Sequence, residues 1–326
     1  MSSWKDNRNR WNNSSQLYLP CYKVNLDSYE VDIVNTNSPL QLELFQLHTN
    51  NYIEDEESSS TFDLETFCWI TRNDVSLLKK DGIVIGMIAL NYHMVSFNGD
   101  SIELVDLSLL CIAKEYRNKG LTTKFVNQTL NLLQSRGDYY HCAFTRRFDG
   151  GGRQPIMQSY SIDINALPNK KVYTTLLECS IDSNPECSID SNPESADRRK
   201  RFNDFLDKYS IHQVLTKEDT MPWVFEHPTN KSLISIIPGH LKKGNMHYNI
   251  AVLRYYAPID MSLRNLVEDL CHTLKGKYDY LLFWDNMLDN ESLTNLPYAR
   301  STGNKIVWQV HVLQTHGAKT IGYSFV

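Results

Sequence analysis

The stretch LSLLCIAKEYRNKGLTTKF, residues 107–125, joins an apolar run to a basic turn and a periodic segment. The apolar run predicts a buried strand, and the periodic segment predicts an amphipathic helix that ends at Gly137. A turn between a strand and a helix N-terminus leaves backbone N–H groups without partners, and the helix dipole adds positive potential. Arg117 and Lys119 add charge, and Gly120 permits close approach of a phosphate. The turn is therefore a candidate phosphate site, with a solvated surface turn as the alternative.

The composition is that of an ordinary globular protein. The chain has 326 residues, a formal net charge of −5, 41% hydrophobic and 22% charged residues, enough for one large domain or two ordinary ones. The seven cysteines form no CxxC pair, so we expect reduced thiols in a cytoplasmic protein and neither a disulfide framework nor a zinc site. Mild acidity argues against nucleic acid as the main partner. No apolar run approaches the roughly 20 residues of a membrane helix, and the polar start lacks a signal-peptide core.

The hydrophobic periodicity predicts two similar halves. In the first half we expect a helix over 38–52, two strands joined by a turn at FNGD within 81–113, and a further strand over 138–145. In the second half we expect a strand over 249–257, a helix over 262–277, a strand over 278–285 and a closing hairpin. The recurring strand–helix–strand order predicts a pseudo-duplicated, mixed α/β fold.

A tandem copy of ECSIDSNP begins at residue 178 and again at residue 186. Because this segment is polar and carries proline, it predicts a low-complexity loop over 178–197. We expect this loop to separate an N-terminal half, 1–177, from a C-terminal half, 198–326.

Several segments, in order along most of the chain, resemble the glycylpeptide N-tetradecanoyltransferase (N-myristoyltransferase) family. DLSLLCIAK (106–114) is similar to the family's E-[IV]-N-F-L-C-x-H-K. NYIEDEESSSTF (51–62) resembles N-Y-V-E-D-D-D-x-x-F-x-F, and TIGYSFV (320–326) resembles K-V-G-L-V-L-Q. The turn at 117–122 also resembles the R/Q-x-x-G-x-G/A pyrophosphate loop of acyl-CoA N-acyltransferases, with Thr122 as its last residue.

The resemblance implies an α/β fold with two pseudo-symmetric acyl-CoA N-acyltransferase-like halves around a saddle-shaped mixed sheet. It implies transfer of a myristoyl group from myristoyl-CoA, the co-substrate, to the N-terminal glycine amine of proteins. The oxyanion donors would be the backbone N–H groups of Leu109 and Leu110, freed from the strand ladder by a bulge. Thr145 would hold the amine, and the terminal carboxylate of Val326 would be the general base.

The resemblance also assigns binding residues. Acyl-CoA would contact Asn9, Arg10, Trp11, Leu109, Leu110, Cys111, Ile112, Arg117, Asn118, Lys119, Gly120, Leu121 and Thr122. The substrate peptide would contact Tyr52, Glu54, Asp55, Phe62 and Asp285, since acidic residues attract basic ones that follow the substrate glycine. No metal is implied.

The motifs depart from the family pattern in places. Ser108 replaces the motif Asn, and Ala113 replaces the motif His. Two alternatives therefore stay open: a CoA-dependent N-acetyltransferase, and a catalytically inactive module that binds acyl-CoA or peptide. The sequence contains neither a G-x-S-x-G elbow nor an H-E-x-x-H pattern, so neither motif supports a hydrolytic activity.

Overall fold

The computed structural model describes residues 28–52, 58–136, 141–147, 156–168, 171–181, 193–217, 219–287, 291–296 and 298–310. Within these ranges the strands form one continuous sheet of 14 strands, in the order β1-β3-β4-β5-β6-β14-β7-β13-β12-β11-β10-β8, with β2 on β11 and β9 on β4. The pairs β5–β6 and β12–β13 are parallel and the others are antiparallel. The predicted mixed α/β class is confirmed.

The strands are β1 Tyr29–Asn35, β2 Ser58–Thr61, β3 Asp74–Lys80, β4 Ile83–Phe97, β5 Asp100–Ile112, β6 His141–Arg147, β7 Ile156–Asp163, β8 Leu177–Ile181, β9 Ile211–Val214, β10 Met221–Glu226, β11 Leu233–Lys243, β12 Met246–Ala257, β13 Tyr280–Trp284 and β14 Ala299–Val310. The helices are α2 Ser38–Asn51, α3 Leu64–Ile70, α4 Leu121–Ser135, α5 Pro193–Leu206, α6 Leu263–Leu274 and α7 Glu291–Thr294, with 3-10 turns η1 Lys114–Tyr116 and η2 Ile164–Ala166.

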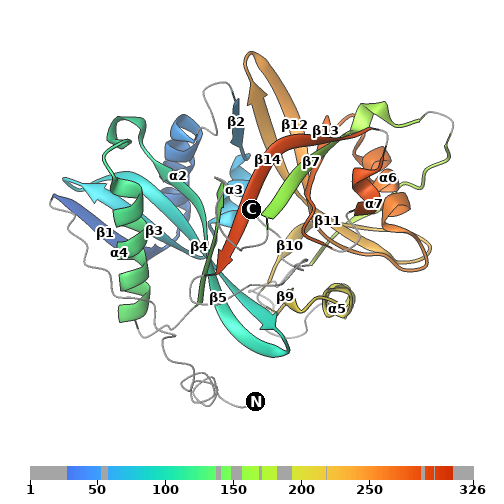
Figure 1. Ribbon diagram of the computed structural model, residues 1–326, viewed down its shortest axis with the longest axis horizontal. Helices are drawn as coiled ribbons and strands as arrows, with labels where there is room; N and C mark the ends of the chain where they lie inside the picture. The colour runs from blue at the N-terminus through green and yellow to red at the C-terminus, as the bar shows by residue number, and fades with distance from the viewer. Residues whose placement is uncertain are drawn as a thin grey trace.

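Helices cover both faces of the sheet around β4 and β5 (Figure 1). On one face α4 buries Leu121, Phe125, Leu130 and Leu133 against apolar residues of β3, β4 and β5. On the other face α2 and α3 pack Leu44, Phe67 and Ile70 against β3, β4 and β5. Both faces of β4 and β5 are therefore withdrawn from water, which explains why the two strands are nearly continuous apolar runs.

The last described strand, β14, lies between β6 and β7 (Figure 1). Trp308 pairs with Thr145 on β6, and Ile306 pairs with Met157 on β7. The second strand of the expected closing hairpin, TIGYSFV, lies outside the described residues, so the hairpin stays a prediction. Because β14 and β9 both pair with strands of residues 1–177, the predicted sequence halves share one sheet.

The predicted loop over 178–197 is too long at both ends. Its first residues belong to β8, which pairs with β10 and is buried at Ile181. Its last residues belong to α5, whose Ser195 is buried. Local polarity concealed β8 and the first residues of α5, because tertiary pairing and packing overrode the weak local preference; the rest of α5 lies in RRKRFNDFLDKYS, whose sequence predicts a helix.

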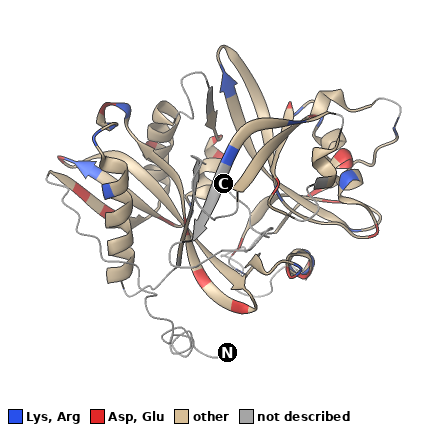
Figure 2. Ribbon diagram, viewed as in Figure 1, with Lys and Arg blue, Asp and Glu red and all other residues tan. Residues whose placement is uncertain are grey.

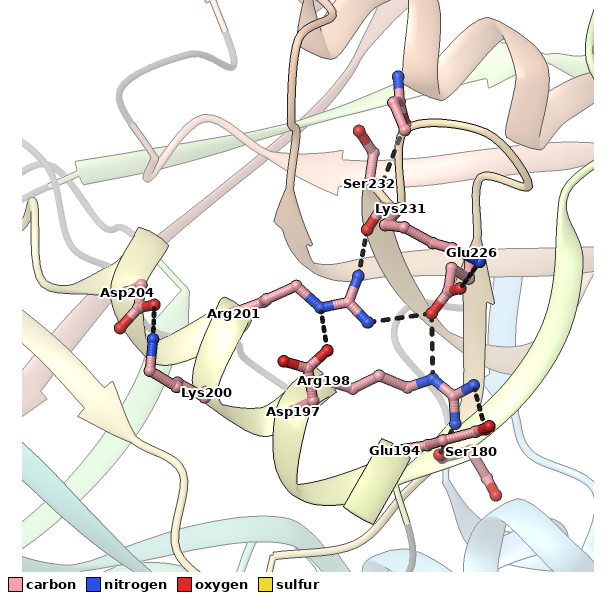
Figure 3. Close-up of polar contacts among 11 residues, drawn as sticks. Ser180, Glu194, Asp197, Arg198, Lys200, Arg201, Asp204, Glu226, Lys231 and Ser232 are labelled. Carbon is pink, nitrogen blue, oxygen red and sulfur yellow. Dashed lines mark hydrogen bonds and ion pairs between the residues drawn. The ribbon is translucent and has the colours of Figure 1, made fainter. Parts of the chain in front are cut away.

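A buried carboxylate ties α5 to the sheet (Figure 3). Glu226, at the end of β10, accepts hydrogen bonds from Arg198 at 3.2 Å, Arg201 at 3.0 Å and Lys231 at 2.9 Å. Burial opposes ionisation of Glu226, but these three donors lower its pKa to about 2. The basic RRKR run at 198–201 is thus partly committed to an internal ion-pair network.

Charged residues of both signs are scattered over the described molecule (Figure 2). No helix in the described part is long and apolar enough to cross a bilayer. Within the same residues, no group of three or more His, Cys, Asp and Glu side chains is arranged to hold a metal ion.

Candidate active site

Strand β5 carries a bulge at Leu109 and Leu110. Ser108 pairs with Ala89 of β4 and Cys111 pairs with Met87, so two residues of β5 lie opposite Ile88. Leu109 has a φ of 50°, which is unfavourable for a residue with a Cβ. A bulge interrupts the ladder and can aim backbone N–H groups away from the partner strand. The predicted bulge is therefore present.

Beyond β5, the chain turns sharply into α4. Asn118 and Gly120 both have positive φ, at 59° and 67°. Gly120 is the N-cap of α4 and supplies no side chain, so the first N–H groups of the helix have no side-chain cap. Such a helix start can bind an anion through its backbone and its dipole.

These two features meet at a cleft of about 370 Å³, within the usual size range of small-molecule sites. The cleft brings together one end of β5, the turn after it, the start of α4 and the end of α2. Its lining residues are Tyr52, Leu110, Cys111, Ile112, Tyr116, Arg117, Asn118, Gly120, Leu121 and Thr122. All but Tyr116 are residues that the sequence assigned to acyl-CoA or peptide. Burial raises the pKa of Cys111 to about 11, so this thiol stays protonated and is a poor nucleophile.

The Arg117 side chain braces the turn. Its Nε donates to the Ile112 carbonyl at 2.9 Å, and one terminal nitrogen donates to the Asn51 carbonyl. Asn51 in turn accepts from the Lys114 backbone N–H at 3.0 Å. Part of the Arg117 guanidinium therefore fixes the end of α2 to the turn, while Lys119 and Asn118 are exposed. The phosphate role of Arg117 stays a prediction.

An aromatic cluster lies behind Tyr52. His48 stacks on Tyr52 with ring centroids 4.6 Å apart, and its ring lies 6.3 Å from that of Phe62 and 5.5 Å from that of Phe67. His48 is fully buried, and burial lowers its pKa to about 4, so the imidazole is neutral near pH 7. Leu109 and Cys111 belong to the same apolar cluster as Phe67. The wall behind the cleft is therefore uncharged.

Other predicted residues lie away from the cleft lining. Lys119 flanks the cleft, with Nζ 5.1 Å from the Tyr116 ring centroid. Asp285 follows β13, accepts from the Gln158 N–H at 2.6 Å, and has its pKa raised by burial. Thr145 is in β6, opposite Trp308. Asn9, Arg10, Trp11, Glu54, Asp55 and Val326 lie outside the described residues.

Sequence reasoning missed four residues of this region. Tyr116 lines the cleft, and its signal was an aromatic residue inside the basic KEYRNKG turn. Asn51 and His48 belong to the last turns of α2; Asn51 is the first residue of the motif NYIEDEESSSTF, whereas no local pattern pointed to His48. Asp106 was detectable as an acidic residue inside an apolar strand, and it is buried.

The fold and the cleft together define an α/β protein with a bulged central strand and an uncapped helix start beside it. No protein-family model and no curated protein sequence matches the chain. Solved structures do match over nearly its whole length.

The chain has the fold of N-myristoyltransferases. The Saccharomyces cerevisiae enzyme solved with bound myristoyl-CoA and inhibitors is similar with a TM-score of 0.73 and 15% identity, over 94% of this chain and 88% of that chain. A second structure of this enzyme with bound myristoyl-CoA has a TM-score of 0.72 and 16% identity, over 93% of this chain and 86% of that chain. A GCN5-related N-acetyltransferase from Anabaena variabilis has a TM-score of 0.50 and 10% identity, over 87% of this chain and 73% of that chain. The fold implied by the sequence motifs is confirmed.

Proposed function

We propose that the protein transfers an acyl chain, with myristoyl preferred, from acyl-CoA to the N-terminal glycine amine of peptides or proteins. The observation that carries the proposal is the bulge at Leu109 and Leu110, since Leu110 also lines the cleft at the uncapped start of α4. Support comes from the fold shared with N-myristoyltransferases that were solved with bound myristoyl-CoA.

In this proposal the reaction is a direct acyl transfer without a covalent enzyme intermediate. The amine attacks the thioester carbonyl, and the Leu109 and Leu110 N–H groups stabilise the developing oxyanion. The start of α4 and Lys119 hold the phosphates of CoA. Thr145 holds the amine, and Val326 supplies the terminal carboxylate as base, as the sequence predicts.

The second candidate is a CoA-dependent N-acetyltransferase, favoured by the similarity to the GCN5-related N-acetyltransferase. Acyl-chain length distinguishes the two. Each buried CH₂ contributes about 0.8 kcal/mol, so removing two methylenes should lower kcat/KM about 15-fold.

The test is a mass-spectrometric assay with acyl-CoAs from acetyl to palmitoyl and a peptide that starts with Gly. The same peptide with an acetylated N-terminus is the control. We expect transfer that peaks near myristoyl and requires the free amine. Equal rates with acetyl-CoA and myristoyl-CoA would favour the acetyltransferase, and myristoyl-CoA binding without product would favour an inactive binding module.

Charge at the turn should affect binding of CoA. We expect Lys119→Glu to weaken acyl-CoA affinity about five- to tenfold at low salt, because an exposed charge loses its attraction to phosphate. Lys124→Glu, an equally exposed change further along α4, is the control and should have little effect. Isothermal titration calorimetry at low and high salt measures both. An affinity that is equal in the two variants would show that the turn does not contact phosphate.

A further inference from the structure

Asp106 is a carboxyl buried in the apolar strand β5. It is 6% exposed, and among the described residues no hydrogen bond or ion pair involves its side chain. A buried carboxyl without a partner is costly, so it calls for a donor that the described residues do not provide. Burial raises the pKa of Asp106 to about 7, which places it between the charged and neutral forms near physiological pH.

Asn91 lies directly opposite Asp106 in the β4–β5 register. Side chains of such a pair lie on the same face of the sheet, with Cβ atoms about 4.5–5.5 Å apart. The Asn91 Nδ2 donates to the Ser108 Oγ at 2.9 Å, while its Oδ1 is buried without a donor. Asp106 and Asn91 therefore form a pair of neighbouring acceptors that both lack donors.

This acceptor pair stands next to the bulge. Ser108 immediately precedes Leu109 and shares a face of β5 with Asp106. On the other side of β5, Asp106 pairs with Ala143 of β6, two residues before Thr145. Asp106 and Ser108 are separated along the strand by about 7 Å. The acceptors thus lie on β4 and β5 directly beside the two residues proposed to stabilise the oxyanion.

The titratable side chains nearest the pair in the register carry no positive charge, although the guanidinium groups of Arg72 and Arg254 act on one of them, His93. Cys142 of β6 and His93 of β4 are the nearest titratable side chains in the register. Burial raises the pKa of Cys142 to about 12, so its thiol is neutral. Burial also lowers the pKa of His93, whose Nδ1 lies 2.9 Å from Gln213 Nε2 and 3.9 Å from Asp219. No described Lys or Arg forms an ion pair with Asp106.

We propose that Asp106 and Asn91 form a docking site for the α-ammonium group of the acceptor peptide. This docking site rests on the proposed function, and it means that the substrate amine binds in its protonated form. An ammonium offers three N–H donors, which match the Asp106 carboxylate, the Asn91 amide oxygen and the Ser108 hydroxyl oxygen. Asp106 holds the ammonium, which then passes one proton to the terminal carboxylate of Val326, the proposed base, and becomes the neutral amine that Thr145 holds.

The acyl transfer then balances without a further reactant. The amine nitrogen forms the C–N bond, the C–S bond breaks, and the thiolate of CoA takes the second amine proton. The terminal carboxylate returns its proton to water before the next peptide binds. Asp106 is thus a positioning residue for the substrate amine.

The test measures peptide binding rather than turnover. The full-length protein is saturated with a thioether analogue of myristoyl-CoA, and calorimetry gives the affinity for a Gly-initiated peptide with a free or an acetylated N-terminus. Wild type should prefer the free amine. Asp106→Asn should weaken binding of the free-amine peptide roughly 10- to 100-fold, the range of a lost charge-assisted hydrogen bond, and leave the acetylated peptide unchanged. Glu103→Gln, a carboxyl change three residues away on β5, is the matched control and should keep the preference.

A structural role for Asp106 predicts a different result. If Asp106 only closes a network with Asn91 and Ser108, Asp106→Asn changes the stability but keeps the wild-type preference for a free amine, and the proposal is overturned. If the wild-type protein transfers no acyl group but binds the free-amine peptide more tightly than the acetylated one, the proposed reaction is rejected and the ammonium site is still supported. Transfer in wild type with no amine preference in binding would reject the ammonium site alone.

Discussion

Deletion of Leu109 is expected to lower kcat by about 10²–10³, or roughly 3–4 kcal/mol in the activation free energy, while acyl-CoA still binds. Ser108 would still pair with Ala89 and Cys111 with Met87, so Leu110 alone would stand opposite Ile88. The strand would therefore become regular without a shift in register on either side. The loss follows because the two backbone donors proposed for the oxyanion no longer exist as a pair.

The control for this deletion is Leu109→Gly. Both variants lose the same buried leucine side chain, which costs about 2–5 kcal/mol of folding stability. Glycine accepts the positive φ of this position and keeps the extra residue, so the bulge remains. We expect this variant to keep most of its turnover per folded molecule. Stopped-flow or steady-state kinetics compares the two, with the number of acyl-CoA binding sites per chain as the measure of folded protein. Equal turnover in the deletion variant and the glycine variant would remove the bulge from the mechanism.

Replacement of Glu226 by glutamine is expected to lower the free energy of unfolding by about 3 kcal/mol at pH 7. Glu226 is 7% exposed and neutralises Arg198 and Arg201, whose side chains are 13% and 17% exposed (Figure 3). Without the carboxylate these guanidinium groups stay buried with less compensation. Glu194→Gln is the control, because Glu194 pairs with the same Arg198 but is 72% exposed, and it should cost less than about 1 kcal/mol.

The same pair of variants gives a pH prediction. The pKa of Glu226 is lowered to about 2 in the folded state from 4.5, so the unfolded state binds the proton first as the pH falls. The contribution of Glu226 is fully present above about pH 4.5 and is lost as the pH falls through about 2. The difference between wild type and Glu226→Gln in urea unfolding should therefore shrink between pH 5 and pH 3. A difference that does not change with pH over this range would show that Glu226 acts through packing and not through charge.

Local sequence patterns were sufficient for the elements around the site. The helix expected over 38–52 is α2, Ser38–Asn51, and the turn expected at FNGD joins β4 to β5. The basic turn before LTTKF leads into α4 as predicted. These features are encoded within a few residues, because a helix start, a two-residue turn and an amphipathic face each depend on neighbours in the chain. The bulge was also expected, although only through resemblance to a family motif.

Contacts between distant segments were decided by the tertiary structure. Insertion of β14 between β6 and β7 pairs residues more than 135 positions apart, and no local periodicity records such a pairing. The repeat at 178–193 was polar enough to predict a loop, yet its edges belong to β8 and α5 because β10 and Glu226 hold them.

The sequence by itself determined the strand, the glycine-containing turn and the helix that line the cleft, and resemblance to a family assigned nine of the ten lining residues to acyl-CoA or peptide. The two-residue turn at FNGD also places Asn91 opposite Asp106, because the β4–β5 register runs unbroken from that turn to Ser108. Only the tertiary structure decided that this polar pair is buried beside the bulge, because α2 and α3, far from it in sequence, cover one face of the two strands and α4 covers the other.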